Sequence, residues 1–185
     1  RDRPLDKQQA ADERHAQFSD KASDFVFYIN LWRQYHEHRQ SLSGNQLRKW
    51  CKQHFLSWMR MREWIDTHRQ IKQMLGEQGL RSNQQTGNYE AIHRSLLSGL
   101  LGNIGRKHEG REFSGARNRR FHVFPGSKLH RAPPQWLMAA EIVETTKVYA
   151  RTLARIEPGW LEDLGRHLLK YSYAEPHWEK KRAQV

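Results

Sequence analysis

Residues 111–124 read REFSGARNRRFHVF, and this stretch decides the expected fold. Its apolar residues Phe113, Phe121 and Val123 alternate with polar and basic residues, which is typical of β-strands. The sequence Phe124-Pro125-Gly126-Ser127 that follows is typical of a turn. The middle of the chain is therefore predicted to be β structure.

Further strands are expected on both sides of this turn. The predicted strands are Glu112–Ala116, Arg119–Phe124, Trp136–Thr145 and Lys147–Ile156. Pro133-Pro134 places a loop before the third strand, because proline fits neither a helix interior nor a central strand. Pro158 is expected to open a final helix, whose apolar face would hold Trp160, Leu161, Leu164 and Leu168. Several short strands with terminal helices suit a small barrel, and an OB-fold is the candidate because basic oligonucleotide-binding modules often use it.

Positive charge is concentrated in the same region. Between Arg94 and Arg131 there are nine Lys or Arg residues and two acids, a net charge of +7 out of +12 for the chain. Basic side chains beside aromatic residues on a small sheet can neutralise phosphates and stack on bases. The isoelectric point of about 10.1 also favours nucleic acid or another acidic surface as partner. A solvated basic face remains the alternative for this cluster.

The chain up to about Gly79 reads as amphipathic helices joined by short turns, which predicts a helical bundle. Ser23-Asp24 is typical of a helix start, and Ser43 with Gln46 predicts a capping box. Apolar residues at helical spacing are expected in the core of this bundle. In a long helix over Ser57–Gln78 these are Met61, Trp64, Ile65, Ile71, Met74 and Leu75.

Another helix is predicted after a polar linker that ends in Thr86-Gly87-Asn88. Its apolar period is Tyr89, Ile92, Leu96, Leu97, Leu100, Leu101 and Ile104. Arg106 and Lys107 are then expected at the C-terminus of this helix, where the helix dipole favours cations. The fold class is thus α+β, with a helical bundle over residues 1–80 and an OB-fold-like barrel with flanking helices over residues 81–185.

Sequence patterns for catalysis or metal binding are missing. The sequence contains no G-x-x-x-x-G-K-[ST] phosphate-binding loop, no H-E-x-x-H pair and no G-x-S-x-G elbow. Cys51 and His54 lack further zinc ligands in sequence, so Cys51 is expected to be a buried core thiol. We therefore expect a non-catalytic chain with no metal or cofactor of its own.

The single cysteine excludes an internal disulfide framework and fits a reducing, cytoplasmic compartment. A membrane partner is not expected, because no apolar run approaches the roughly 20 residues of a spanning helix. The chain opens at Arg1 without Met, so we expect it to be excised from a longer protein.

Ordered motifs across almost the whole chain resemble the C-terminal region of DEAH-box RNA helicases. The first part resembles the helical bundle (ratchet) domain of that family at Arg3-Pro4-Leu5-Asp6-Lys7-Gln8, Ser23-Asp24-Phe25, Leu31-Trp32 and Arg60-Met61-Arg62-Glu63-Trp64. The second part resembles the family's OB-fold at residues 98–104, 121–127, 134–136, 144–149 and 156–161. Phe-Pro-Gly-Ser at residues 124–127 is closest to the bacterial, HrpA-like branch.

The resemblance implies an accessory part of an ATP-dependent RNA helicase, which would bind single-stranded RNA and close the RNA channel. ATP and Mg²⁺ would be bound by upstream helicase domains, and these domains would also be partners of this chain. An activator or a ribosome-associated protein would be a further partner. Two alternatives stay open: a protein-docking platform, and a stand-alone module that binds RNA or DNA without sequence preference.

The predicted RNA-binding residues come from the basic region and from the family motifs. They are Arg62, Arg106, Lys107, Arg117, Arg119, Arg120, His122, Ser127, Lys128, Lys147 and Tyr149. Ser127, Lys128 and Lys147 are expected to contact phosphates, since hydroxyl and ammonium groups commonly do. His122 or Tyr149 is expected to stack on a base.

Alternatives stay open for several of these residues. Tyr149 would pack in the core if it does not stack. The alternative for Arg117 and Arg120 is simple solvent exposure, and the alternative for Arg62 is a surface pair with Asp66 at i+4.

Overall fold

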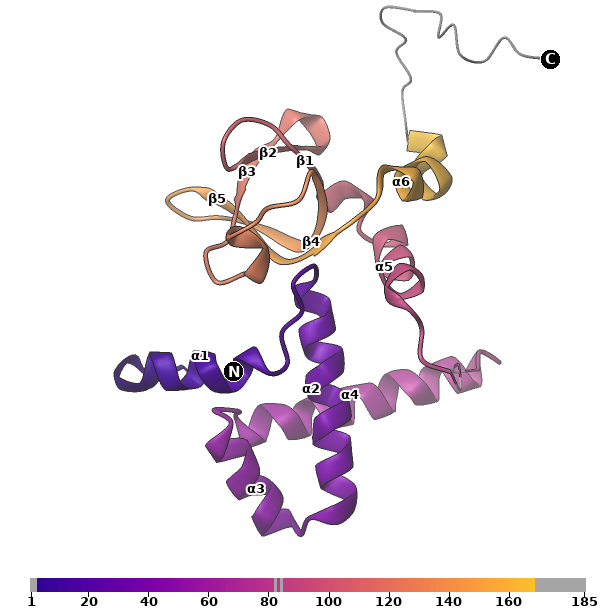
Figure 1. Cartoon of the computed structure of the whole chain (residues 1–185). Helices are drawn as coiled ribbons and strands as arrows, with labels where there is room; N and C mark the ends of the chain where they lie inside the picture. The colour runs from indigo at the N-terminus through magenta and orange to yellow at the C-terminus, as the bar shows by residue number, and fades with distance from the viewer. Residues whose placement is uncertain (1–2, 82, 84, 169–185) are drawn as a thin grey trace, which may run out of the picture.

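The computed structural model describes residues 3–81, 83 and 85–168 and contains both helices and a β-barrel, which confirms the predicted α+β class (Figure 1). The helices that precede the barrel strands are α1 (Gln8–Ala16), α2 (Asp24–Ser41), α3 (Gly44–Gln53), α4 (Trp58–Glu77) and α5 (Tyr89–Ser98). The strands are β1 (Ile104–Lys107), β2 (Glu112–Gly115), β3 (Arg120–Val123), β4 (Trp136–Glu144) and β5 (Val148–Arg155), followed by α6 (Pro158–Gly165). Within the described residues, no helix combines the length and the apolar character needed to cross a membrane.

Side-chain caps fix where the helices begin. The Ser23 hydroxyl accepts hydrogen bonds from the backbone N–H groups of the first turn of α2. Ser43 and Gln46 form the predicted capping box of α3, and the Asn88 side chain caps α5. Each cap satisfies backbone donors that the helix itself leaves without a partner.

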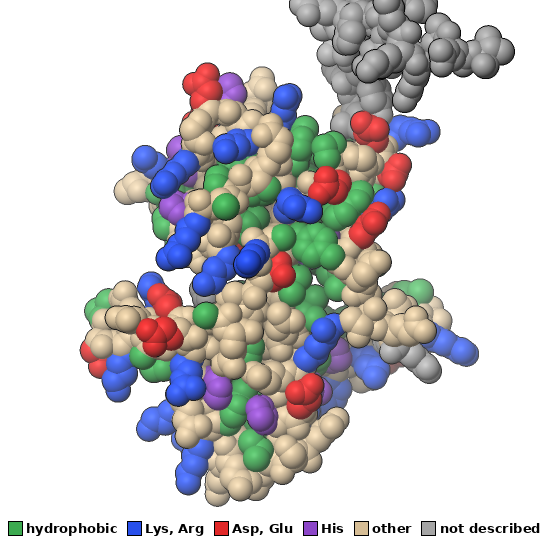
Figure 2. Space-filling model, in the orientation of Figure 1, with side chains coloured by type: hydrophobic (Ala, Val, Ile, Leu, Met, Phe, Trp, Pro, Cys, Tyr) green, Lys and Arg blue, Asp and Glu red, His purple; other side chains and the backbone are tan. Residues whose placement is uncertain are grey.

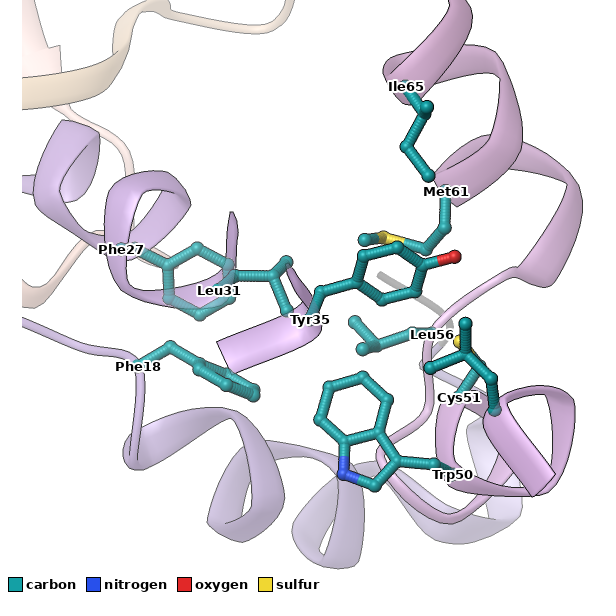
Figure 3. Packing of buried hydrophobic residues seen from close by; sticks show 10 residues of the cluster. Phe18, Phe27, Leu31, Tyr35, Trp50, Cys51, Leu56, Met61 and Ile65 are labelled. Atoms are coloured by element: carbon teal, nitrogen blue, oxygen red, sulfur yellow. The ribbon is translucent and has the colours of Figure 1, made fainter. Parts of the chain in front are cut away.

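Helices α2, α3 and α4 share one aromatic-rich core, shown in Figure 3. Its buried residues are Phe18, Phe27, Leu31, Tyr35, Leu47, Trp50, Cys51, Leu56, Met61 and Ile65. Cys51 is buried as predicted. The core prediction was wrong for Ile71, Met74 and Leu75, which are exposed because the last turns of α4 extend beyond α2 and α3 (Figure 1).

Helix α5 is shorter than its apolar period predicted. It ends at Ser98, a 3-10 turn covers Leu101–Asn103, and β1 begins at Ile104. Arg106 and Lys107 therefore lie on a β-strand and not at a helix C-terminus, which corrects the prediction. Gly99 and Gly102 interrupt the helix, since glycine is among the poorest helix formers. The apolar residues beyond the break still pack into one cluster with α5, β4 and α6.

The five strands form a closed barrel in the order β1-β2-β3-β5-β4. All neighbouring pairs are antiparallel except β3 and β5, which run parallel. The four predicted strands are confirmed to within two residues at each end, and β1 is the strand that the prediction missed. The barrel interior holds Phe113, Phe121, Val123, Leu129, Leu137, Ala139, Ala150 and Leu153.

Two glycines make room for an aromatic ring inside the barrel. Gly105 of β1 lies opposite Gly115 of β2. A Cβ atom on Gly105 would lie 2.4 Å from the Phe121 ring, and one on Gly115 would lie 2.8 Å from it. Because the Phe121 side chain is only 1% exposed, it has little space into which it could move. The glycine pair thus fits the narrow barrel to its largest core residues.

The segment before α2 is joined to the barrel through backbone hydrogen bonds. Ser23 forms an isolated β-bridge with Ala154 of β5. The Arg155 N–H group donates to the Ala22 carbonyl oxygen at 2.8 Å. The start of α2 is therefore attached directly to the edge of β5.

Asp24 strengthens this junction with its carboxylate. The Leu153 N–H donates to one Asp24 oxygen at 3.0 Å, and the Lys128 N–H donates to the other at 3.4 Å. Thr152, the residue before Leu153, has a φ of +54°, which is rare for a β-branched residue. This distortion lies where β5 turns a backbone N–H toward the helix instead of toward β4.

A buried histidine connects α5 to the same junction. The Nδ1–H group of His93 faces the Tyr89 carbonyl at 2.6 Å, so Nε2 is left to accept from the Ser23 hydroxyl at 2.7 Å. The Tyr89 hydroxyl lies within hydrogen-bond distance of the carbonyl oxygens of Ala22 and Arg155. Burial lowers the pKa of His93, and the Tyr89 carbonyl and Asp20 oppose that effect only in part. The neutral form of His93 therefore completes this network.

Candidate nucleic-acid interface

A groove on the barrel lies where β3 and β5 run side by side. We call it the β3–β5 groove, and it is lined by Arg111, His122, Val123, Pro125, His130, Pro133, Lys147 and Tyr149. The parallel register places His122 directly beside Tyr149, with ring centroids 6.3 Å apart. Three predicted residues, His122, Lys147 and Tyr149, are thus brought together by the fold.

The chemistry of this groove combines cations with partly exposed rings. Arg111 and Lys147 are exposed, and no ion pair engages either of them within the part of the chain that the structure describes. Tyr149 is half-buried and packs edge-on against Phe124 at 6.0 Å, so its ring is both supported and accessible. The turn that presents Lys147 is fixed by Thr145, whose N–H and hydroxyl both donate to the Lys147 carbonyl.

Arg106 and Lys107 lie on a different surface of the barrel. They border a second groove together with Ile104, His108, Ser114, Gly115, Ala116, Gln135 and Trp136. The Arg106 guanidinium lies 5.9 Å from the centroid of the Trp136 ring, within the range of a cation–π contact. This surface therefore offers a planar cation supported by an aromatic ring.

The three predicted arginines near β3 form an exposed loop cluster. Arg117 has a φ of +56° and Asn118 a φ of +57°, so the chain turns sharply between β2 and β3. Arg117 and Arg119 are exposed, as is Arg120, which approaches Glu112 at 3.8 Å. Figure 2 shows Lys and Arg side chains gathered over the barrel, with many acids on the side of α5 and α6.

Ser127 and Lys128 lie at the junction between the barrel and α2. Ser127 is buried, and its hydroxyl accepts from the Leu129 N–H at 3.2 Å, which caps a short 3-10 turn. Ser127 also lines the cleft beside Lys128, and its predicted phosphate contact stays a prediction. Lys128 is exposed and borders a cleft that also contains Arg151.

Arg62 is separated from all the barrel residues. It is exposed on α4, in a cleft between the helices. Asp66 pairs with Arg69 at 3.0 Å and not with Arg62, so the surface pair that was the alternative for Arg62 is not formed.

Sequence reasoning missed three residues of these surfaces. Arg111 belonged to the basic stretch but had no motif, and His130 was assigned only to a loop. Arg151 lies over the Phe124 ring at 4.7 Å, and its buried Nε atom has no hydrogen-bond partner among the described residues. Arg151 lies on β5, and no local sequence signal predicts the parallel pairing of that strand with β3.

Comparison with known proteins agrees with the barrel geometry. Residues 92–168 match the family described as oligonucleotide/oligosaccharide-binding (OB)-fold. The whole chain is 46% identical to part of the ATP-dependent RNA helicase HrpA of Escherichia coli and 47% identical to part of its homolog in Haemophilus influenzae. The chain spans only 14% of the length of each of these two proteins.

A more distant relative is a eukaryotic splicing protein. Over 93% of the chain, the identity is 27% to the pre-mRNA-splicing factor ATP-dependent RNA helicase prp22 of Schizosaccharomyces pombe, and the chain spans 14% of that protein.

Proposed function

Since this chain belongs to the C-terminal region of DEAH-box RNA helicases of the HrpA type, with an OB-fold at residues 92–168, we propose that it binds single-stranded RNA as an accessory part of such an enzyme. It would close one side of the RNA channel and take no part in bond cleavage. Its partners would be the strand itself and the other domains of the helicase.

The β3–β5 groove is the observation that supports this proposal most strongly. Arg111 and Lys147 supply positive charge that no acid among the described residues pairs, while His122 and Tyr149 supply ring faces beside it. Nonspecific single-strand sites combine these two features, because phosphates need cations and every base has a π-face. The Arg106–Trp136 surface and the Arg117–Arg120 loop would extend the positive field around the barrel.

We assign nucleotide hydrolysis to other parts of the enzyme. The described residues include no group of three or more His, Cys, Asp or Glu side chains that could hold a metal ion. The sequence also has no phosphate-binding loop, and for this reason the proposal places ATP and Mg²⁺ with other domains. The first part of the chain, residues 1–80, would serve as the ratchet-like helical bundle beside the strand.

The direct test is binding of the 185-residue chain to a fluorescent single-stranded RNA, measured by anisotropy over a salt series. The double variant Arg111→Ala/Lys147→Ala removes two cations of the groove. If each neutralises one phosphate, the slope of log K against log salt falls by about 1.4, because single strands contribute roughly 0.7 per phosphate. Tyr149→Ala is expected to weaken binding at every salt concentration without changing the slope, since it removes only stacking.

The matched control is Arg48→Ala/Lys49→Ala, which removes the same charge from the exposed surface of α3. If the control weakens binding as much as the groove variant, binding reflects net charge alone and the groove has no special role. If the wild type does not bind at low salt, the alternative of a protein-docking surface replaces this proposal.

A further inference from the structure

The cleft that contains Arg62 is a separate feature of the helical part and shares no lining residue with the β3–β5 groove. It lies between α2, α3 and α4 and is lined by Tyr35, Arg39, Leu42, Gly44, Leu47, Trp58, Arg62, Ile65, Asp66 and Arg69. Three arginines thus surround one cleft whose only acid is Asp66. Tyr35 and Arg39 lie one turn apart on α2, and only the packing of α4 beside α2 brings Arg62 to the same cleft.

The phenol of Tyr35 forms part of the floor of this cleft. The Tyr35 side chain is only 1% exposed and packs against Trp50 at 6.1 Å between ring centroids. Figure 3 shows its hydroxyl pointing away from Phe18 and Phe27, toward the side of the core where α4 lies. The structure gives this hydroxyl no hydrogen bond to any described residue. Because Tyr35 lines the cleft, its hydroxyl offers a hydrogen-bond donor there that phenylalanine would lack.

Two guanidinium groups, those of Arg39 and Arg62, line the same cleft as this hydroxyl. Burial raises the pKa of Tyr35, while the charges of Arg39 and Arg62 act in the opposite direction. Both arginines are exposed, and within the described residues neither forms an ion pair. Arg69 is different, because Asp66 holds it at 3.0 Å.

The start of α3 adds to the positive character of the cleft. Gly44, the first residue of α3, lines it. The capping box engages the N–H groups of Ser43 and Gln46, which leaves those of Gly44 and Asn45 available. A helix N-terminus carries partial positive charge and exposes N–H groups, and both favour an anion. The nearest acid, Asp66, is already neutralised by Arg69.

We propose that this cleft is a phosphate-binding site, in which Arg39 and Arg62 hold the oxyanion from the sides and the Tyr35 hydroxyl donates to it from below. Guanidinium groups match phosphate geometry, and a hydroxyl that donates to an anion makes a strong, charge-assisted hydrogen bond. The phosphate belongs either to the backbone of an RNA strand or to a small phosphorylated molecule. The strand source rests on the proposed function, whereas the site itself does not.

Inorganic phosphate is the first probe, added to the 185-residue chain at constant ionic strength in exchange for chloride. The Arg39 and Arg62 side-chain Nε–H signals are followed by ¹H–¹⁵N NMR. Saturable shifts of both signals are expected. Tyr35→Phe keeps the buried ring and removes only the oxygen, and it is expected to weaken phosphate binding about tenfold. Arg62→Gln changes a surface residue and is expected to abolish the saturable shift of the remaining Arg39 signal.

Lys49→Gln is the matched control, since it removes one charge from the exposed side of α3 and lies outside the cleft. The site is refuted if phosphate causes no saturable shift, or if Tyr35→Phe binds phosphate as well as the wild type. It is also refuted if Lys49→Gln weakens binding as much as Arg62→Gln does.

A second arm identifies the source of the phosphate. Single-stranded RNA is added to the phosphate-loaded protein, and the same arginine signals are followed. Displacement of phosphate assigns the site to the strand, while unchanged signals assign it to a small phosphorylated ligand. Repeating this arm with Arg111→Ala/Lys147→Ala separates the two proposals, because loss of the barrel groove leaves inorganic phosphate binding in the helical cleft intact.

Discussion

Gly105→Ala is expected to destabilise the barrel through a single, identifiable contact. The added Cβ would lie 2.4 Å from the outermost atom of the Phe121 ring, roughly 1 Å closer than an ordinary contact. Phe121 is almost completely buried, so either its ring or strand β1 must shift. Overpacking of this kind costs about 1–3 kcal/mol. We expect about 2–3 kcal/mol for Gly105→Ala, which corresponds to a fall in Tm of roughly 5–10 °C for a chain of this size.

Urea unfolding followed by tryptophan fluorescence would measure this loss. Gly102→Ala is the matched control, because a Cβ at Gly102 meets nothing within 4 Å. Phe121→Leu supplies the complementary test, since it removes the outer ring atoms and should relieve the clash. In a double-mutant cycle, Gly105→Ala and Phe121→Leu are expected to couple favourably by at least about 1 kcal/mol. Additive effects, or equal stability of Gly105→Ala and Gly102→Ala, would refute the packing explanation.

Three other outcomes follow from buried polar groups. The pKa of His93 is lowered in the folded state, so the unfolded state binds more protons near pH 6.5 and the free energy of unfolding falls as the pH falls through that range. His93→Gln should reduce this pH dependence in urea titrations. An unchanged dependence of the free energy of unfolding on pH would contradict this prediction. Asp24→Ala leaves the Leu153 N–H without its acceptor and is expected to cost about 1–3 kcal/mol in thermal or urea unfolding, with Asp24→Asn costing less. Burial raises the pKa of Cys51 to about 11, so a thiol reagent at pH 8 should label it only at the rate of unfolding, and rapid labelling of the native protein would show that it is accessible.

Short-range signals in the sequence predicted much of the fold. The capping box at Ser43 and Gln46 is present, and the alternation around Phe121 does form a strand. These features depend on residues within one or two turns of each other. The apolar period from Tyr89 to Ile104 predicted a shared packing face that is present from Leu96 onward, but it predicted the conformation wrongly, because a 3-10 turn and a strand can continue the same face.

The candidate site depended on longer-range information. The parallel register that places His122 beside Tyr149 joins strands far apart in sequence, and periodicity does not specify it. Ser127 follows a glycine turn and was expected at a phosphate, yet its hydroxyl caps the next backbone turn. Local side-chain to backbone hydrogen bonds of this kind compete with ligand contacts, and a serine after a turn is compatible with both.

The attachment of α2 to β5 has a mechanical consequence. The helix has 18 residues and is therefore a rod of roughly 27 Å, fixed at one end by backbone hydrogen bonds. A displacement of about 1 Å at its far end, near Ser41, would tilt the rod by roughly 2° about that anchor. The strand at this anchor is β5, which also forms one wall of the β3–β5 groove. A force applied where α2 meets α3 would therefore act on the groove through the helix and the strand, with no loop between them.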